Sequence, residues 1–420
     1  MLKSNFTVKT GERIEEKECF FQEKTIVLRD ITPTPYNLKE RQIPLSSVYK
    51  ISSFEDSFTI YFDQGKELTF SNNNLTTRTE WIFNVQSNIG DNSSHLTEKS
   101  FNYIAEIARG KYSIVKLVEN KDTHKQYAMK IVNKSFLSCQ NKISTALTER
   151  NILERVNHPF IISLDYAFQS STAFYFCMEF MKFGDLFTHM QNSRRLKFEE
   201  IKLYVAEIAI AIHYLHGLNI VYRDLKPENI MLTEDGHIKL IDFNLSKELS
   251  QDEPSTHSFV GTNEYLAPEI VLKESYGKEV DWWSLGILIF EMVFNRTPFQ
   301  SQNQSRTLSK IANGRVMIPD CGNYDLVNLL DGLLKKDPKK RFCFKDIRNH
   351  PFFHPLDFDD VLKKKYKPLN VPKPITINKF ESDFDDESDT CIIRDYSSID
   401  DGLIYIPDFY LDRLCDNNMK

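Results

Sequence analysis

Residues 222–229 read Tyr222-Arg223-Asp224-Leu225-Lys226-Pro227-Glu228-Asn229, and Asp242-Phe243-Asn244 follows the apolar run at 238–241. One short loop therefore carries a carboxylate, a lysine and an amide, and a second carboxylate comes soon after it. Phosphoryl transfer from ATP needs this set, because one acid receives the incoming hydroxyl and oxygen ligands hold magnesium. Loop-capping polar residues alone would not explain five such groups at these intervals.

This spacing resembles the catalytic loop and the magnesium loop of eukaryotic protein kinases, and the likeness extends from about residue 99 onward. The resemblance implies an α+β fold of two lobes, with ATP and Mg2+ as cofactors. Asp224 would then accept the proton of the substrate hydroxyl, and Lys226 would neutralise charge on the transferring phosphate. Asn229 and Asp242 would ligate magnesium.

The chain has 420 residues, of which 41% are hydrophobic and 27% are charged. That length is too great for one hydrophobic core, so two or three folding units are expected. We expect a front domain at 1–88, a polar linker at 89–100, a kinase domain at 101–353 and a tail at 354–420. The tail is acidic and lacks regular periodicity, so by composition alone it would be disordered.

The front domain contains short strands followed by one helix. Residues 58–62 and 68–70 alternate with a period of two, which predicts strands. A helix is predicted at 77–87, with Trp81 and Val85 on one face. Strands closed by one helix that carries a single Trp resemble a pleckstrin-homology domain, which is a small β-barrel capped at one end.

The resemblance to kinases assigns nucleotide contacts to several further segments. Lys130 in Ala128-Met129-Lys130 would hold the α- and β-phosphates, and Glu149 is its expected partner, with Glu154 as a rival one helical turn later. The expected contacts to ATP are Ile107, Ala108, Arg109, Gly110, Lys111, Tyr112, Ser113, Val115, Ala128, Lys130, Glu179, Met181 and Phe380.

Two loops depart from the family pattern. Gly110 is the one glycine kept over the phosphates, and Ala108 and Ser113 replace two others, so weaker nucleotide binding is expected. Asn244 stands in the magnesium loop where the family has glycine. Asn is the non-glycine residue that best tolerates a positive φ, so we expect an impaired hinge at Asn244 and a competent Asp242.

Other features resemble the AGC group of basophilic serine/threonine kinases. Tyr222 replaces the usual histidine, and Asp281-Trp282-Trp283-Ser284-Leu285-Gly286 follows the group's pattern. In the tail, Phe380 would complete the adenine pocket. Residues 406–411 resemble the hydrophobic motif that docks on the small lobe, with Tyr410 at the position that is phosphorylated; a plain apolar turn is the alternative. The whole layout resembles the protein kinase B family.

The same resemblance assigns substrate contacts. The backbone at Glu179 and Met181 would read adenine, while Asp185, Glu228 and Glu291 would group acids around substrate arginines. Carboxylates bind guanidinium in bidentate fashion, so protein substrates with basic residues before the target Ser or Thr are expected. Asp185 is one methylene shorter than the family's glutamate, which should loosen one subsite.

Three residues are expected to hold the site together without taking part in the chemistry. Glu269 and Arg341 resemble the family's ion pair, because a buried carboxylate needs a cation. Asp281 resembles the helix carboxylate that fixes the catalytic loop.

Regulation by phosphorylation is also expected from the resemblance. Ser258 occupies the activation-segment phosphosite, and an upstream activating kinase would modify it. A phosphate there would pair with Arg223 and Lys247 and order the segment. Thr256 is the competing site, and an unmodified surface serine is the plain alternative.

Bulk properties limit the partners and the compartment. The net charge of −6 argues against general nucleic-acid binding, and seven cysteines without a CxxC pair indicate free thiols in a reducing compartment. We therefore expect a cytoplasmic protein that is recruited to the plasma membrane if its front domain binds phosphoinositides. The candidate lipid contacts are Lys9, Arg13, Lys17 and Lys24. Acids lie among them, so a mixed-charge surface that binds a protein or only autoinhibits is equally open.

Two other functions compete with an active kinase. Ala108, Ser113 and Asn244 would suit a weakly active or dead pseudokinase scaffold, although the retained catalytic set argues against it. A lipid-binding adaptor would need more cations than the front domain concentrates.

Overall fold

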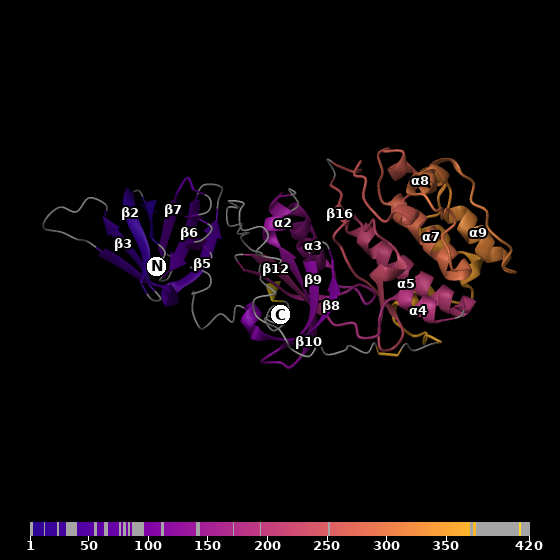
Figure 1. The fold of residues 1–420 in the computed structure, drawn as a ribbon, viewed down its shortest axis with the longest axis horizontal. Coiled ribbons are helices and arrows are strands. Elements are labelled where there is room, and N and C mark those ends of the chain that lie inside the picture. The colour runs from indigo at the N-terminus through magenta and orange to yellow at the C-terminus, as the bar shows by residue number, and fades with distance from the viewer. Residues whose placement is uncertain are drawn as a thin grey trace. The chain divides into compact units, whose positions relative to one another are not determined.

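A computed structural model describes residues 3–369, with gaps at 12, 23–24, 31–39, 54–56, 63–65, 75–76, 79–80, 83–84, 86–95, 111–112, 140–142, 171, 194 and 251–252, and beyond them residues 373–374 and 411–412. The chain forms two compact units, and Figure 1 labels many of their helices and strands. The first unit combines residues 1–143, 166–177 and 379–420, and the second combines 144–165 and 178–378.

The front of the chain is an antiparallel sheet of seven strands in the order β4-β3-β2-β1-β7-β6-β5. Because β4 and β5 stand at opposite ends of this order, the described strands do not close into a barrel, and the predicted barrel is wrong in that respect. The strands are β1 (Lys3–Thr10), β2 (Arg13–Gln22), β3 (Thr25–Asp30), β4 (Glu40–Pro44), β5 (Val48–Ser53), β6 (Ser57–Phe62) and β7 (Lys66–Ser71).

One helix and a cluster of aromatic rings form the core of this sheet. Trp81 and Val85 are helical and fully buried, which confirms that they share the inner face. The Trp81 ring packs edge-on against Phe6 with 5.2 Å between centroids, and Phe58 stacks on Phe70 at 4.9 Å. Aromatic rings in these geometries add to the free energy gained from burial alone.

A second antiparallel sheet holds the segments expected to contact nucleotide. Its order is β17-β11-β12-β10-β9-β8, so the two-residue strand β17 lies at one edge. The elements are β8 (Phe101–Arg109), β9 (Ser113–Asn120), β10 (Gln126–Asn133), β11 (Leu164–Gln169), β12 (Ala173–Glu179), β17 (Leu411–Asp412) and the helix α2 (Lys134–Cys139).

The tail therefore returns to this sheet. Leu411 lies opposite Ala167 and Asp412 opposite Tyr166 in an antiparallel pair, and Leu411 is buried. This pairing supports the prediction that the tail docks on the small lobe. Phe380 and the other residues of the expected tail motifs, including Tyr410, lie outside the described residues.

The turn η2 (Glu98–Ser100) binds the same sheet from the end of the predicted linker. The hydroxyls of Tyr103 and Tyr175 donate to the two carboxylate oxygens of Glu98 at 2.7 and 2.9 Å. The backbone N–H of Lys121 donates to the Ser100 carbonyl at 3.0 Å. These bonds tie the segment before residue 101 to three parts of the sheet.

The second unit is mainly helical, and its long helices α5 and α7 pack against each other. Both are buried along most of their length, because their apolar residues extend round the helix. The helices are α3 (Ile143–Arg155), α4 (Leu186–Asn192), α5 (Phe198–Gly217), α6 (Pro268–Val271), α7 (Glu279–Phe294), α8 (Gln304–Asn313), α9 (Tyr324–Leu333), α10 (Phe344–Arg348) and α11 (Phe358–Leu362).

Short strands and 3-10 turns position the loops of this unit. Two antiparallel ribbons pair β13 with β16 and β14 with β15. In the described part of the chain, no helix combines the length and the apolar character that crossing a bilayer requires. The remaining elements are β13 (Ile220–Val221), β14 (Ile230–Leu232), β15 (Ile238–Leu240), β16 (Lys247–Glu248), η1 (Leu45–Ser47), η3 (Pro227–Asn229), η4 (Asn263–Tyr265), η5 (Pro338–Lys340) and η6 (Pro351–Phe353).

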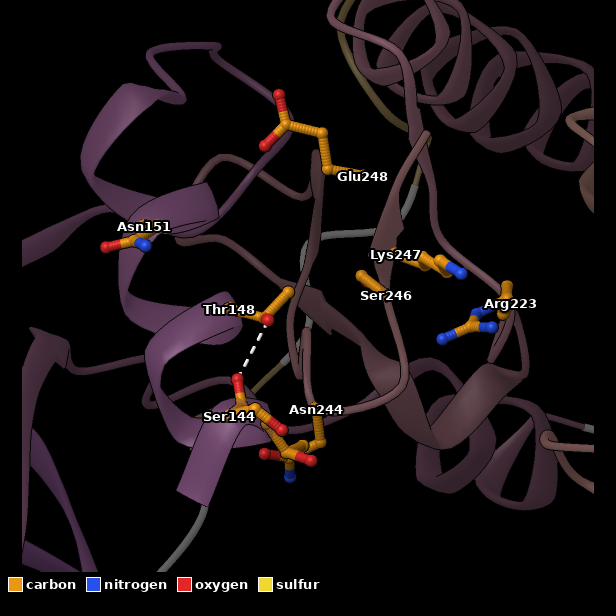
Figure 2. A pocket seen from close by; sticks show the side chains of 9 residues that line it. Ser144, Thr148, Asn151, Arg223, Asn244, Ser246, Lys247 and Glu248 are labelled. Carbon is orange, nitrogen blue, oxygen red and sulfur yellow. Dashed lines mark hydrogen bonds between the residues drawn. The ribbon is translucent and has the colours of Figure 1, made fainter. Parts of the chain in front are cut away.

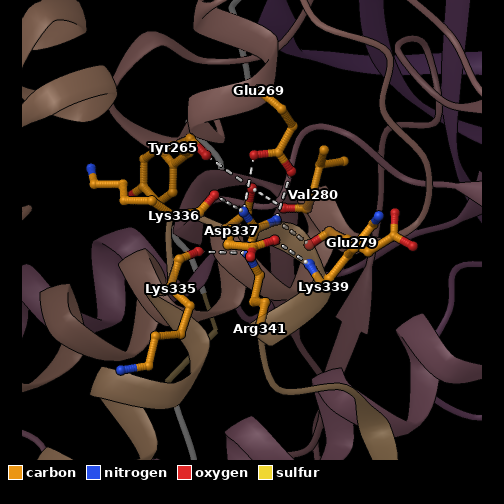
Figure 3. A network of polar contacts seen from close by, with 10 residues as sticks. Tyr265, Glu269, Glu279, Val280, Lys335, Lys336, Asp337, Lys339 and Arg341 are labelled. Atoms are coloured by element: carbon orange, nitrogen blue, oxygen red, sulfur yellow. Dashed lines mark hydrogen bonds and ion pairs between the residues drawn. The ribbon is translucent and has the colours of Figure 1, made fainter.

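The predicted ion pair between Glu269 and Arg341 is confirmed (Figure 3). Two nitrogens of Arg341 donate to the two carboxylate oxygens of Glu269 at 2.7 and 2.9 Å. Their side chains are only 0% and 3% exposed. Arg341 also donates to the carbonyls of Glu279 and Lys335, so the buried guanidinium is well satisfied.

Candidate active site

The catalytic loop between β13 and β14 is fixed by one buried carboxylate. Asp281, in the first turn of α7, accepts the backbone N–H groups of Tyr222 at 2.9 Å and Arg223 at 2.8 Å. Its third contact is with the Nε2 atom of His216 at 2.8 Å. Arg223 has a φ of 69°, a strained backbone that the two bonds to Asp281 hold in place. The predicted role of Asp281 is confirmed.

Three polar groups surround Asp224, two from the same loop and one from a later segment. The Asn229 amide nitrogen donates to the Asp224 carboxylate at 2.8 Å and to its carbonyl at 2.9 Å. The Lys226 ammonium lies 2.9 Å from the same carboxylate. The hydroxyl of Thr262 donates to the other carboxylate oxygen at 2.7 Å and lies 3.0 Å from the Lys226 nitrogen.

The two expected magnesium ligands both offer oxygen. Because the amide nitrogen of Asn229 is bonded to Asp224, the amide oxygen of Asn229 is the atom left for a cation. Asp242 begins the next loop with a φ of 57°. An amide oxygen and a carboxylate are hard donors that suit Mg2+, so these two residues fit that ion.

The prediction of a left-handed backbone at Asn244 is wrong. The positive φ of this loop belongs to Asp242, and Asn244 is not among the described residues with positive φ. Asn244 therefore needs no glycine-like conformation, and the physical basis for an impaired hinge is removed. Its backbone N–H instead donates to the Asp242 carboxylate over 3.4 Å.

The expected lysine and glutamate lie on β10 and α3. Lys130 is 6% exposed and Glu149 is 1% exposed. The rival Glu154 is exposed and pairs with Arg150 at 2.6 Å along the same helix. Because a buried carboxylate needs a cation while an exposed one does not, burial favours Glu149 over Glu154.

The loop expected to cover the phosphates is a short hairpin between β8 and β9. The N–H of Gly110 donates to the carbonyl of Ser113 at 2.8 Å, which closes the turn. Arg109 forms a two-armed ion pair with the glutamate three residues before it. Lys111 and Tyr112, at the tip of the loop, lie outside the described residues.

The expected adenine-reading segment follows β12. The N–H of Glu179 donates to the carbonyl of Ser163 at 3.3 Å, so its carbonyl is the group that remains for a nucleobase. The Glu179 carboxylate is held by Lys239 and by the N–H of Ser163. Met181 is 9% exposed. The Glu179 carboxylate is therefore occupied by contacts within the protein, and these contacts hold the backbone of this segment in place.

Asp185, the first expected substrate acid, caps a helix. Its carboxylate accepts the N–H of Thr188 at 2.6 Å, at the start of α4. A side-chain oxygen at this position satisfies one of the free N–H groups of the helix. One oxygen of Asp185 is therefore engaged by its own helix, and one is left for a substrate.

The other two substrate acids belong to a cluster of three. Glu291 accepts the Tyr265 hydroxyl, and Glu264 accepts the Thr297 hydroxyl. Burial raises the pKa of Glu291, and repulsion from Glu228 and Glu264 raises it further against the Tyr265 bond. In the described part of the chain, no ion pair joins these three acids to a cation. The cluster is therefore suited to bind a basic group from outside.

The activation segment distinguishes the two candidate phosphosites. Thr256 is 4% exposed and forms a two-bond backbone bridge with Tyr276, whereas Ser258 is exposed. The Thr256 hydroxyl lies 3.2 Å from the Ser258 hydroxyl and 3.4 Å from the Lys247 nitrogen. Tyr276 donates to the Ser258 carbonyl at 2.7 Å and accepts from Arg223 at 3.2 Å. Accessibility favours Ser258.

A polar pocket of about 320 Å³ lies beside this segment in the second unit (Figure 2). The catalytic loop and β16 contribute the cations Arg223 and Lys247 to its lining, and the first turns of α3 contribute hydroxyl groups. Its lining residues are Ser144, Thr145, Thr148, Asn151, Arg223, Asn244, Ser246, Lys247 and Glu248.

Sequence reasoning missed two residues of this site. Thr262 reaches Asp224, and Glu264 joins the acid cluster at Glu291. Both belong to the short run 261–265, whose position ahead of Ala267-Pro268-Glu269 was the available signal.

Known proteins are similar to this chain over most of the region that contains the site. The sequence profile of the protein kinase domain matches residues 101–353. The chain is 41% identical to the serine/threonine-protein kinase sgk-1 of Caenorhabditis elegans over 66% of this chain and 61% of that protein. It is 39% identical to Sgk1-B of Xenopus laevis over 72% of each chain. It is 37% identical to YPK1 of Saccharomyces cerevisiae over 80% of this chain and 50% of that protein.

Proposed function

The chain belongs to the protein kinase family, and from that membership we propose that it is an ATP- and Mg2+-dependent serine/threonine kinase acting in signalling. The observation that carries the proposal is the arrangement at Asp224, where an amide, an ammonium and a hydroxyl converge on one carboxylate. Such a group is positioned to orient a hydroxyl nucleophile.

Each side chain has a proposed task. ATP and magnesium, when bound, supply the γ-phosphoryl group and screen its charge. Asp224 accepts or orients the substrate hydroxyl, and Thr262 and Asn229 hold its carboxylate in one orientation. Lys226 lies close enough to Asp224 to meet the transferring phosphate. Asn229 and Asp242 would hold the metal, and Lys130, oriented by Glu149, would hold the α- and β-phosphates.

We place the enzyme in the AGC group, with basic protein substrates. Support comes from the acid cluster of Glu228, Glu264 and Glu291, which has no cation of its own in the described residues. A guanidinium placed there removes the mutual repulsion that raises the pKa of Glu291. Asp185 contributes less, because one of its oxygens already caps α4.

Activation by phosphorylation of Ser258 is part of the proposal. Ser258 is exposed and therefore accessible to an upstream kinase. The Tyr276 hydroxyl donates to the Ser258 carbonyl and accepts a hydrogen bond from Arg223. The Thr256 hydroxyl contacts both the Lys247 nitrogen and the Ser258 hydroxyl, so it lies between these two groups. Two cations near one serine suit a phosphate that carries nearly two negative charges.

For the front domain we propose a pleckstrin-homology-like regulatory role that favours a protein partner over a lipid. Lys17, one of the expected lipid contacts, is paired with Glu15 and Asp30. Arg13 and Arg41 line a pocket of about 360 Å³ and form no ion pair among the described residues. These two arginines lie beside Glu15 and Glu40, which have basic partners of their own, so the surface carries mixed charge.

A phosphate-transfer assay tests the central proposal. The full chain, labelled ATP and magnesium are incubated with a peptide that carries arginines before a serine. Asp224→Asn and Lys130→Ala should abolish incorporation, because the first removes the carboxylate and the second a phosphate contact. Asp331→Asn, which removes an exposed acid on α9, is the matched control and should retain activity.

The same assay distinguishes an active kinase from a pseudokinase scaffold. No incorporation by the wild-type chain, with Ser258 either free or phosphorylated, would favour a pseudokinase. Equal incorporation by wild type and both variants would show that the activity comes from a contaminant. Sedimentation of the full chain with anionic vesicles tests the lipid alternative separately, and binding to those vesicles would contradict the preference for a protein partner.

A further inference from the structure

The helices α4 and α5, both labelled in Figure 1, meet at a polar junction. The Nε2 atom of His189 on α4 lies 3.9 Å from a carboxylate oxygen of Glu200 on α5, and the two side chains are only 12% and 2% exposed. The His189 ring meets the Tyr204 ring edge-on, with 6.3 Å between centroids. Among the described residues, neither that Nε2 atom nor the buried Tyr204 hydroxyl has a hydrogen-bond partner. Buried polar atoms are rarely left in this state, so their presence between two helices needs an explanation.

Apolar packing of α4 does not supply that explanation. Leu186 and Met190 are buried, and their spacing places them on the same side of the helix as His189. A third apolar side chain at position 189 would extend this contact without burying a polar atom. The histidine therefore adds a direction to the packing, because its Nε2 atom faces one particular carboxylate.

Glu200 is itself held in place at the start of α5. Its other carboxylate oxygen accepts the N–H of Lys197 at 3.2 Å, and its own N–H donates to the Lys197 carbonyl at 3.1 Å. The carboxylate that faces His189 is therefore fixed to the backbone of its own helix, and it gives α4 a fixed point of contact.

His189 is also bonded to Asp185, the first of the expected substrate acids. The N–H of His189 donates to the Asp185 carbonyl at 3.1 Å. The Asp185 backbone forms an antiparallel bridge with Met231, which fixes where α4 begins. The Asp185 carboxylate accepts the N–H of Thr188 at 2.6 Å, so its orientation follows the first turn of the helix. With the starting point fixed, rotation of α4 about its axis decides where the second carboxylate oxygen of Asp185 points.

We propose that His189 is a positioning residue for Asp185, and that its contact with Glu200 thereby sets the affinity for basic substrates. The inference rests on the proposed kinase function, in which the second oxygen of Asp185 binds a substrate guanidinium. Hydrogen bonds to a guanidinium are directional, so a rotation of α4 costs affinity. The loop that carries Asp224 is fixed separately by Asp281, so the transfer step does not depend on this junction.

The first test measures transfer by the full chain to a peptide that carries arginines before its serine. His189→Phe keeps an aromatic ring and removes the nitrogen that faces Glu200. The KM for the peptide should rise by about tenfold with kcat near wild type, because one directed contact is lost and the chemistry is untouched. His189→Gln keeps a polar group at this position and should restore most of the affinity. Gln191→Ala, an exposed side chain on the same helix, should match wild type.

A double-mutant cycle with Asp185 separates positioning from general damage. Asp185→Asn keeps the helix cap, because asparagine caps a helix as well as aspartate does, but it loses the charge that attracts a guanidinium. In this background, His189→Phe should raise the KM no further, because its effect passes through the Asp185 carboxylate.

Binding of the same peptide, followed by fluorescence anisotropy, gives a readout that does not depend on catalysis. A wild-type KM in His189→Phe would overturn the proposal. An equal rise of KM in the Asp185→Asn background would overturn it as well, and so would a His189→Gln variant as weak as His189→Phe. If wild type binds the peptide more tightly than His189→Phe but transfers no phosphate, the kinase proposal fails while the positioning role of His189 stands.

Discussion

The hydroxyl of Thr262 donates a hydrogen bond of 2.7 Å to the carboxylate of Asp224. Asp224 belongs to the catalytic loop, and Thr262 belongs to the segment that carries Ser258. One bond therefore joins the end of the activation segment to the proposed catalytic carboxylate. Because Thr262 also meets the Lys226 nitrogen at 3.0 Å, it orients both groups at once.

Replacing Thr262 tests this link. Thr262→Ala should lower kcat by about tenfold to hundredfold, since a hydrogen bond to a charged group is lost. Thr262→Ser keeps the hydroxyl and is the matched control, with kcat close to wild type. The KM for ATP should stay unchanged in both, because Thr262 is not among the residues expected to contact ATP. Full kcat in the alanine variant would show that the bond has no part in orientation.

The buried pair of Glu269 and Arg341 gives a prediction about stability. Arg341→Met should lower the free energy of unfolding by about 3–5 kcal/mol, because it leaves a buried carboxylate without a partner. Combining it with Glu269→Leu should recover much of that loss. Lys335→Met, which breaks an exposed pair with Asp331, should cost less than about 1 kcal/mol. Urea unfolding measures all three, and a double variant as unstable as Arg341→Met would contradict the account.

His158 makes stability depend on pH. Burial lowers the pKa of His158 from 6.5 to about 4, and its ring stacks on Tyr214 at 4.8 Å. The unfolded chain takes up a proton on His158 near pH 6.5, whereas the folded chain does so only near pH 4. The free energy of unfolding should therefore fall as pH drops through that window, because the unfolded state binds more protons there.

Urea midpoints measured across that pH window check this expectation. His158→Gln removes the titrating group and should show a smaller fall in stability than wild type. His257→Gln changes an exposed histidine and serves as the control, with a fall equal to that of wild type. Parallel curves for wild type and His158→Gln would mean that other groups cause the pH dependence.

The catalytic loop could be predicted from sequence because its groups are contiguous. Between Asp224 and Asn229 the chain is short, so spacing alone nearly determines which side chains meet. Thr262 and Glu264 could not be assigned in this way, because they come from a distant segment that only the folded chain brings to the loop. The asparagine at position 244 suggested a positive φ in the magnesium loop, but the sequence could not show that this φ belongs to Asp242.

The front sheet shows the same limit at a larger scale. Alternation along β6 and β7 predicted strands correctly, and the buried Trp81 marked the core. Whether the sheet closes depends on pairing between β4 and β5, its two ends. A period of two determines which face is buried, but it carries no information about which strands become neighbours.

The contact of Leu411 with the sheet edge gives the last prediction. Leu411 is 8% exposed and lies opposite Ala167, so its side chain anchors a strand of only two residues. Leu411→Ala should weaken docking of the tail by about 2–3 kcal/mol, the cost of removing buried methyl groups. Hydrogen exchange should then accelerate by about tenfold or more at the β11 amide that faces β17, which is one of Tyr166 and Ala167, because exchange follows local opening. Leu369→Ala, at a position that is 55% exposed, is the matched control and should leave exchange unchanged. If Leu411→Ala exchanges as slowly as wild type, backbone pairing alone holds the tail, and the apolar side chain is not its anchor.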